Sequence, residues 1–262
     1  MILSEQDQAE IAADLRDRLD GPVGIELWTK PQSAIALPES EACIHCEDAV
    51  ALARELVSLH PDLSFTAYDL ERHPDRASEE QIDRPPVTVV RAHNRTLRFV
   101  GYCTGVLFRP LVDAIVFASA RSTPLSDQTR QALDELPELL KLDLYVAPYD
   151  PYSADMLLLA YALGIESTNV RVTAWEMAEF PQLASQRAIT AVPMLAINGR
   201  QFPGLWSEDQ LVEQLRRSAA GDDSPVIRDH VLTTPLASAD EQRATPAGTA
   251  PRGGGIFIPG RS

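Results

Sequence analysis

The sequence predicts an α/β chain in which two tandem units, each a mixed sheet flanked by helices, precede a flexible C-terminal segment. Three observations predict this fold class. Short motifs of the first half recur in the same order in the second half. Strand-like runs alternate with helical ones, and each half closes on a hairpin pattern. Residues 219–262 are rich in Gly, Pro, Ser, Thr and Ala and show little periodicity.

The composition is that of a globular protein, because 45% of the residues are hydrophobic and 23% are charged. A net charge of −15 disfavours nucleic acid and anionic membranes as partners. No apolar stretch approaches the ~20 residues of a membrane-spanning helix, and the acidic N-terminus does not resemble a signal peptide. Three cysteines are too few for a disulfide-stapled secreted scaffold. We therefore expect a cytoplasmic protein, in which a close cysteine pair is catalytic or metal-binding rather than structural.

Each unit is expected to open with a capped helix and a strand. Residues 3–6 (Leu-Ser-Glu-Gln) recur as residues 125–128 (Leu-Ser-Asp-Gln), and in both motifs the serine is placed to cap the next helix. Residues 25–28 (Ile-Glu-Leu-Trp) recur as residues 142–145 (Leu-Asp-Leu-Tyr), two alternating runs that predict strands. The expected helices cover residues 9–19 and 129–140.

The rest of each unit follows the same plan. Residues 43–46 (Cys-Ile-His-Cys) and 150–153 (Asp-Pro-Tyr-Ser) each open an apolar helix, and a proline segment follows in both halves. The expected elements are helices 49–59 and 154–163, strands 63–70 and 170–175, hairpins 87–100 and 194–202, and closing helices 105–118 and 207–217. A tandem duplication explains these matches, so we assign the units to residues 1–121 and 122–218. The first unit also carries an acidic insertion, residues 30–42, before its cysteine pair.

Cys43 and Cys46 form a Cys-x-x-Cys pair at the start of a predicted helix. The positive end of the helix dipole favours a thiolate there and lowers the pKa of the first thiol from its usual value of about 8.5. His45 adds a positive charge or a hydrogen bond to that thiolate. Acidic neighbours oppose this effect: Glu39, Glu41, Glu47 and Asp48. We expect Cys43 to be the nucleophile and Cys46, one turn into the helix, to be the resolving thiol.

Two other interpretations of the pair stay open. The two cysteines and a histidine could hold zinc, but a structural zinc site needs four ligands and the sequence has no second paired ligand motif. The pair could also be inert. The spacing and the helix start favour a redox pair, and we expect neither a metal ion nor a bound cofactor.

The motifs carry a family resemblance. Three motifs follow one another in the first unit: a Cys-x-x-Cys helix start, Ile82-Asp83-Arg84-x-Pro86, and Arg98-Phe99-x-Gly101-x-x-x-Gly105. This series resembles the tandem protein disulfide oxidoreductases, also called glutaredoxin-like proteins, which consist of thioredoxin-like units. The resemblance covers roughly residues 1–218. It implies that Pro86 and Pro193 are cis-prolines, and that the backbone before each pairs with an extended substrate peptide. Pro85, directly before Pro86, is unusual and stiffens this loop.

The resemblance also assigns roles to carboxylates and marks a degenerate site. Glu26 and Asp143 align with the buried carboxylate that helps to move the proton of the resolving thiol; a solvent-facing strand position is the alternative. Asp150 and Ser153 occupy the places of the second pair of thiols. The second unit therefore cannot exchange disulfides, and we expect it to bind peptide or to act as a scaffold.

Two further features, a third cysteine and an apolar motif near the C-terminus, each have two interpretations. Cys103 lies in the loop that borders the dithiol in thioredoxin folds, so it is a candidate third thiol or a small buried filler. Ile256, Phe257 and Ile258 form an apolar motif near the C-terminus. In layout it is similar to the cargo-loading peptides of bacterial protein nanocompartments, so it is a candidate docking tail for a compartment shell or another partner; a chance apolar cluster is the alternative.

The expected function is therefore thiol–disulfide exchange with protein substrates through Cys43 and Cys46. The resemblance implies an external reductant, which we expect to be a flavin-dependent thioredoxin reductase. The alternative is a redox-inactive adaptor or partner-docked cargo protein that uses the fold and the tail for binding. The sequence does not fix the direction of electron flow.

Overall fold

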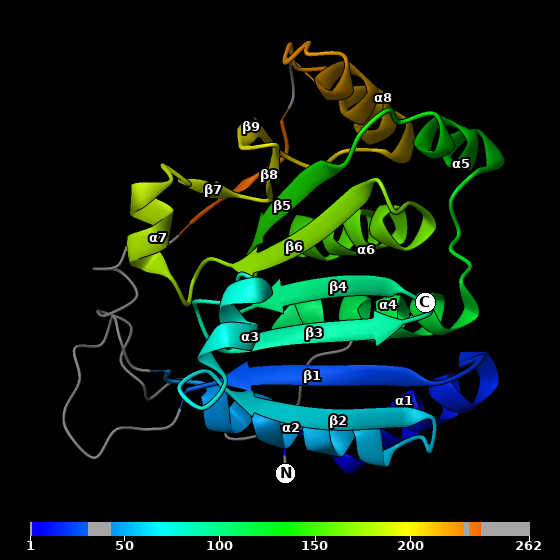
Figure 1. The fold of residues 1–262 in the computed structure, drawn as a ribbon, viewed down its shortest axis with the longest axis vertical. Coiled ribbons are helices and arrows are strands. Elements are labelled where there is room, and N and C mark those ends of the chain that lie inside the picture. The colour runs from blue at the N-terminus through cyan, green and yellow to red at the C-terminus, as the bar shows by residue number, and fades with distance from the viewer. Residues whose placement is uncertain (1, 31–42, 228–230, 237–262) are drawn as a thin grey trace.

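A computed structural model describes residues 2–30, 43–227 and 231–236. Most of the insertion at residues 30–42 and the apolar motif Ile256, Phe257 and Ile258 lie outside the described residues. One mixed sheet of eight strands runs through both halves, in the order β2-β1-β3-β4-β6-β5-β8-β9 (Figure 1). This arrangement confirms the predicted α/β class with helices on a mixed sheet.

The first half follows the predicted order of elements. Ser4 caps the first helix in a reciprocal pair of hydrogen bonds with Asp7, and His93 and Asn94 form the hairpin turn in the left-handed region. The elements are α1 (Glu5–Arg18), β1 (Val23–Thr29), α2 (Cys46–Ser58), β2 (Leu63–Asp69), α3 (Pro74–Glu79), β3 (Val87–Ala92), β4 (Arg95–Val100), the short 3-10 helix η1 (Gly105–Leu107) and α4 (Phe108–Ala120).

The second half repeats that order. Its elements are α5 (Asp127–Asp134), β5 (Leu140–Val146), α6 (Pro151–Glu166), β6 (Val170–Glu176), α7 (Pro181–Gln186), β7 (Ala191–Val192), β8 (Met194–Ile197), β9 (Arg200–Pro203) and α8 (Glu208–Ala219). The predicted helix 129–140 is wrong at its end. The chain leaves the helix at Asp134 because Pro137 disfavours helical backbone in the residue before it.

The two halves join along the middle of the sheet. Within each half the first strand pairs in parallel with the second and antiparallel with the first strand of the hairpin. β4 then pairs in parallel with β6, with Arg98 opposite Thr173. Strands β1 to β4 of the first half and β5, β6, β8 and β9 of the second half thus form one continuous sheet.

Helices α2, α4 and α6 cover one face of the sheet, and α3 and α7 lie on the other (Figure 1). The main core lies beneath α2, α4 and α6 and includes buried side chains from both halves: Ile25, Leu52, Phe99, Ile115, Leu144 and Leu157. Two smaller clusters lie under α3 and α7, around Trp28 and Tyr145. On the side of α3 and α7 the middle strands are only partly covered, and residues of β3, β4, β5 and β6 line a cavity there. We call this side the open face of the sheet. In the described part of the chain, no helix has the length and apolar character needed to cross a membrane.

The prediction of a flexible segment from residue 219 onward needs a correction. Residues 231–236 return to the second half, where β10 (Thr234–Pro235) pairs antiparallel with β7. The Leu205 N–H donates to the Leu232 carbonyl at 3.1 Å, and the Leu236 N–H donates to the Thr190 carbonyl at 2.9 Å. Composition missed this strand because its hydrogen-bonding partners lie far away in the sequence.

Candidate active site at the start of helix α2

Cys43 and Cys46 are joined by a disulfide at the N-terminal end of α2. Cys43 is half-buried and Cys46 is buried, with 4% of its surface exposed. The Cys46 Sγ accepts a hydrogen bond from the Lys30 N–H at 3.4 Å. His45 is the N-cap of α2, and its own side chain makes no capping hydrogen bond. Cys46 is the first residue of α2, so the positive end of the helix dipole acts on the disulfide loop.

His45 lies close to carboxylates of both halves, Asp48 in the first and Glu179 in the second. Its ring stacks on Tyr102, with the ring centroids 5.5 Å apart. Its Nδ1 lies 3.7 Å from the Asp48 Oδ2, so the predicted acidic neighbour is present. The Tyr102 N–H donates to the Glu179 Oε2 at 2.6 Å. Burial raises the pKa of Glu179, while the Tyr102 N–H and the charge of His45 act to lower it.

A second carboxylate, that of the buried Glu176, lies beside Glu179. Glu176 is 5% exposed and accepts hydrogen bonds from the Ala178 and Glu179 N–H groups, both at 2.8 Å. Burial, reinforced by the charge of Glu179, raises the pKa of Glu176 to about 8. Gly101 allows this close approach: its φ is +104°, and a Cβ there would lie 2.8 Å from the Glu176 Cβ.

Sequence reasoning missed Glu176 and Glu179 as site residues. They belong to the second half, and no local motif marks them. One signal could have found them: they lie at and just after the carboxyl end of β6, and the first half places residue 43 beyond the carboxyl end of β1. The carboxyl ends of parallel strands form one edge of a sheet, where sites gather.

Both proline positions match the expectation. The peptide bonds before Pro86 and Pro193 are cis. The Pro86 carbonyl accepts from the Gly101 N–H at 2.8 Å, and the Pro193 carbonyl accepts from the Gly204 N–H at 2.9 Å. The two halves therefore build the same local structure around the cis-proline, although the residue before it is Pro85 in one half and Val192 in the other.

No protein-family model matches the sequence, and no curated protein matches it. Among solved structures, a protein disulfide oxidoreductase from Aeropyrum pernix is similar, with a TM-score of 0.75 and 25% identity over 87% of this chain and 98% of that chain. The chain has the fold of the protein disulfide oxidoreductases. The similarity confirms the resemblance predicted from the motifs and, in general terms, the class of thiol–disulfide oxidoreductase.

Two further structures share this oxidoreductase fold. The alkylhydroperoxide reductase AhpF of Enterococcus faecalis has a TM-score of 0.72 and 16% identity, over 82% of this chain and 100% of that chain. Sso1120 of Sulfolobus solfataricus has a TM-score of 0.55 and 13% identity, over 75% of this chain and 99% of that chain. At these identities the likeness concerns the fold alone.

The structure does not place Glu26 at the disulfide of this oxidoreductase fold. Side chains alternate along β1: Ile25 faces α2, whereas Glu26 faces the side of α3. There Glu26 pairs with the Arg76 Nη2 at 3.0 Å and the Arg91 Nε at 3.1 Å. The proposed proton role of Glu26 is therefore not supported, because the sheet separates it from α2. Asp143 likewise accepts a hydrogen bond from the Trp175 Nε1 at 2.9 Å, beside the open face.

Cys103 is a free, buried thiol in the main core. Its Sγ donates a weak hydrogen bond to the Leu107 carbonyl at 3.5 Å. Burial, helped by the charge of Glu176, raises the pKa of Cys103 well above its usual value. A buried, protonated thiol is a poor nucleophile, so the structure favours the filler interpretation over the third thiol.

The degenerate site of the second half is a closed polar network. Asp150 caps α6, and its Oδ2 accepts from the Ser153 N–H at 2.8 Å and from the Ser153 Oγ at 2.5 Å. The Thr234 Oγ1 donates to the Asp150 Oδ1 at 2.5 Å. Both Asp150 and Ser153 are fully buried. Within the ranges that the structure describes, no group of three or more His, Cys, Asp or Glu side chains is arranged to hold a metal ion.

Proposed function

We propose that the chain is a thiol–disulfide oxidoreductase that exchanges disulfides with protein substrates through Cys43 and Cys46, while its second half serves as a scaffold. The observation that carries this proposal is the disulfide itself, with Cys43 more exposed than Cys46 at the start of α2. This asymmetry suits a nucleophile that meets the substrate and a resolving thiol that stays inside.

In the reducing direction, the Cys43 thiolate attacks one sulfur of a substrate disulfide and releases the other sulfur as a thiolate. The Cys46 thiolate then attacks the Cys43 Sγ, which breaks the mixed disulfide and releases the second substrate thiolate. Two electrons pass to the substrate, its thiolates take up two protons, and the Cys43–Cys46 disulfide remains. The reverse sequence donates a disulfide.

Restoring the dithiol requires an external two-electron reductant. A flavin-dependent thioredoxin reductase is the reductant we propose, and the fold shared with the reductase AhpF supports a reductase-linked partner. His45 assists the dithiol: its ring is held against Tyr102, and a positive charge on it would favour the thiolate form of the nearby cysteine.

The second half indicates how a substrate peptide binds to the first. There, β10 pairs antiparallel with Val192, the residue directly before Pro193, so an extended segment of the chain occupies this edge. The equivalent edge of the first half lies at Arg84 and Pro85. We propose that a substrate strand pairs with this edge, as in other cases where a peptide adds a strand to a sheet.

Trapping the mixed disulfide tests the proposed function. Cys46→Ser removes the resolving thiol, so a protein substrate that reacts with Cys43 should remain attached as a stable adduct. Mass spectrometry after incubation with a disulfide-containing protein should locate the bond at Cys43. The matched control is Cys43→Ser, which should trap nothing; an adduct at Cys103 instead of Cys43 would refute the assignment.

Replacing Pro85 by Val should strengthen peptide binding. Pro85 has no N–H to donate to a bound strand, whereas Val192 in the second half has one. One added backbone hydrogen bond contributes about 1 kcal/mol, so we expect KM for a peptide disulfide to fall about fivefold with kcat little changed. A small aromatic disulfide, which cannot pair as a strand, serves as the control. An equal change for both substrates would contradict the peptide-edge assignment.

A further inference from the structure

The open face of the sheet holds a cavity of about 580 Å³. Its floor consists of β3, β4, β6 and β5, and its walls come from the end of α3 and the loop that follows α6. It lies on the face opposite α2, since α2 packs on Ile25 from the other side. The volume falls in the range of ~300–1,000 Å³ that small-molecule sites occupy.

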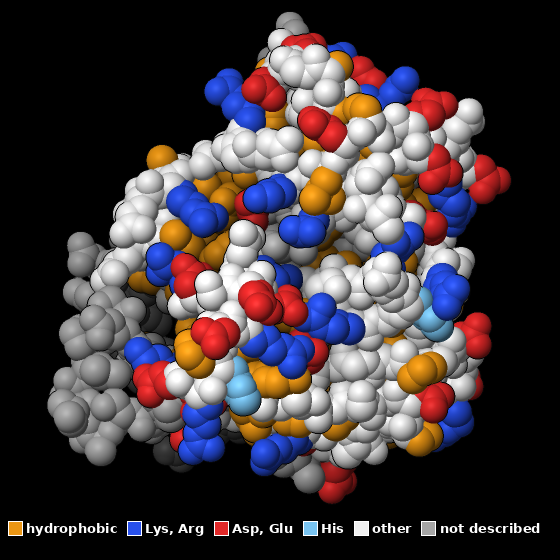
Figure 2. Space-filling view, viewed as in Figure 1, with side chains coloured by type: hydrophobic (Ala, Val, Ile, Leu, Met, Phe, Trp, Pro, Cys, Tyr) orange, Lys and Arg blue, Asp and Glu red, His pale blue; other side chains and the backbone are white. Residues whose placement is uncertain are grey.

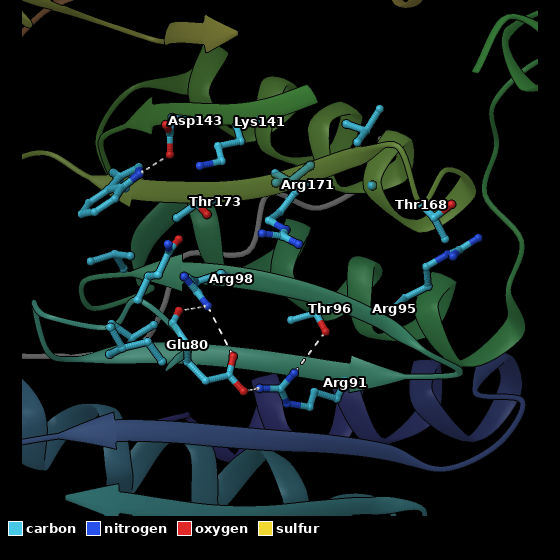
Figure 3. Close-up of a pocket in the computed structure, with 18 of the residues that line it drawn as sticks. Glu80, Arg91, Arg95, Thr96, Arg98, Lys141, Asp143, Thr168, Arg171 and Thr173 are labelled. Carbon is cyan, nitrogen blue, oxygen red and sulfur yellow. Dashed lines mark hydrogen bonds and ion pairs between the residues drawn. The ribbon is translucent and has the colours of Figure 1, made fainter. Parts of the chain in front are cut away.

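The floor of this cavity is basic, in a chain whose net charge is −15. Lys141 on β5 lies directly opposite Arg171 on β6, and Arg98 on β4 lies opposite Thr173, two residues along β6 from Arg171. The labelled side chains of these three residues point into the same space in Figure 3. Figure 2 shows Lys and Arg side chains gathered around a hollow over the middle strands.

The carboxylates that line the cavity do not neutralise all of these cations. Glu80 accepts from the Arg91 Nη2 at 2.5 Å and lies 3.5 Å from the Arg98 Nη2. By contrast, no carboxylate among the described residues forms an ion pair with Arg171 or with Lys141. Two like charges placed side by side repel each other.

Arg98 gives a second, independent indication. Its Nε is buried and has no hydrogen-bond partner among the described residues. Burial and the neighbouring charges of Arg91 and Arg171 lower the pKa of Arg98, against the effects of Glu80 and Asp143. A buried N–H without a partner is costly, and an anion in the cavity would supply an acceptor.

We propose that this cavity binds a small soluble molecule that carries a phosphate or pyrophosphate group, held by Arg98, Lys141 and Arg171. Guanidinium groups bind phosphate oxygens through paired, charge-assisted hydrogen bonds. The hydroxyls of Thr96, Thr168 and Thr173 line the same cavity and provide further donors. The site is separate from the disulfide, so its ligand is not a partner in thiol exchange.

Calorimetric titration with pyrophosphate tests this site. The full-length protein should bind pyrophosphate in a buffer whose ionic strength is held constant with sodium chloride. Arg171→Gln should weaken this binding about tenfold, since a hydrogen bond to a charged group contributes about 1.5–3 kcal/mol. Arg171 is exposed, so the variant should fold, and its melting curve without ligand should match that of the wild type.

The matched control is Arg200→Gln, which removes an exposed arginine on β9 outside the cavity. This variant should bind pyrophosphate like the wild type. Equal weakening in both variants would reduce the effect to net charge and overturn the proposal, as would wild-type protein that binds no pyrophosphate. Sedimentation with phosphatidic acid vesicles forms a separate arm: binding to vesicles but not to pyrophosphate would contradict a soluble ligand.

Discussion

Replacing Cys43 by Ser is expected to lower the rate of protein disulfide reduction by about a thousandfold or more. A serine hydroxyl is not ionised at neutral pH and cannot form a disulfide, so the first covalent step is lost. Loss of a nucleophile typically removes most of the rate enhancement of the whole catalytic unit. Insulin reduction, followed by turbidity in the presence of excess dithiol as the electron donor, measures this rate.

Cys103→Ser provides the control for that experiment. Cys103 is buried with a raised pKa, so its removal should leave the rate within about twofold of wild type. It should also lower the free energy of unfolding by roughly 1 kcal/mol, because a hydroxyl replaces a buried thiol. Similar losses of activity in both variants would contradict the assignment of Cys43 as the nucleophile.

Glu176→Gln is expected to change how stability depends on pH. The pKa of Glu176 is raised to about 8 in the folded protein and is about 4.3 in an unfolded chain. The folded state thus retains a proton that the unfolded state loses. The contribution of Glu176 is fully present below about pH 4.3 and is lost as pH rises to about 8, at up to ~1.4 kcal/mol per pH unit.

Glutamine stays neutral, so the free energy of unfolding of the variant should lack the decrease with pH that Glu176 causes in the wild type. Denaturant unfolding between pH 5 and 8 should show the free energy of unfolding of Glu176→Gln rising relative to wild type as pH increases. Loss of one backbone hydrogen bond to the side chain adds a constant offset that does not alter the slope. Glu10→Gln, at an exposed position on α1, is the control. Parallel curves for wild type and Glu176→Gln would show that Glu176 is ionised throughout.

Local signals in the sequence predicted much of the fold. Ser4 and Ser207 are N-caps with reciprocal partners three residues later, and such caps are visible in four consecutive residues. The duplicated order of motifs predicted the two halves, and the family resemblance implied the two cis-prolines. The cysteine pair was identifiable because its chemistry depends on spacing and on a helix start.

Other features depend on tertiary structure and left no local signal. Glu26 lies in a strand with apolar residues on both faces, so the pattern alone could not show which face α2 covers. Glu176 and Glu179 reach the site of the first half only because β4 pairs with β6. Thr234 closes the network of Asp150 from a segment whose composition predicted flexibility. Arg98, Lys141 and Arg171 come from three strands and meet only in the assembled sheet.

The central claim is that Cys43 and Cys46 exchange two electrons with a substrate disulfide. A single-turnover experiment tests it most directly: reduced protein is mixed with an oxidised peptide, and oxidised protein with the reduced peptide, and mass spectrometry then measures the redox state of both partners. We predict that, in at least one direction, the Cys43–Cys46 bond changes state in a one-to-one ratio with the peptide disulfide, while Cys103 stays a free thiol. Peptide and protein that keep their initial states in both directions would contradict the account.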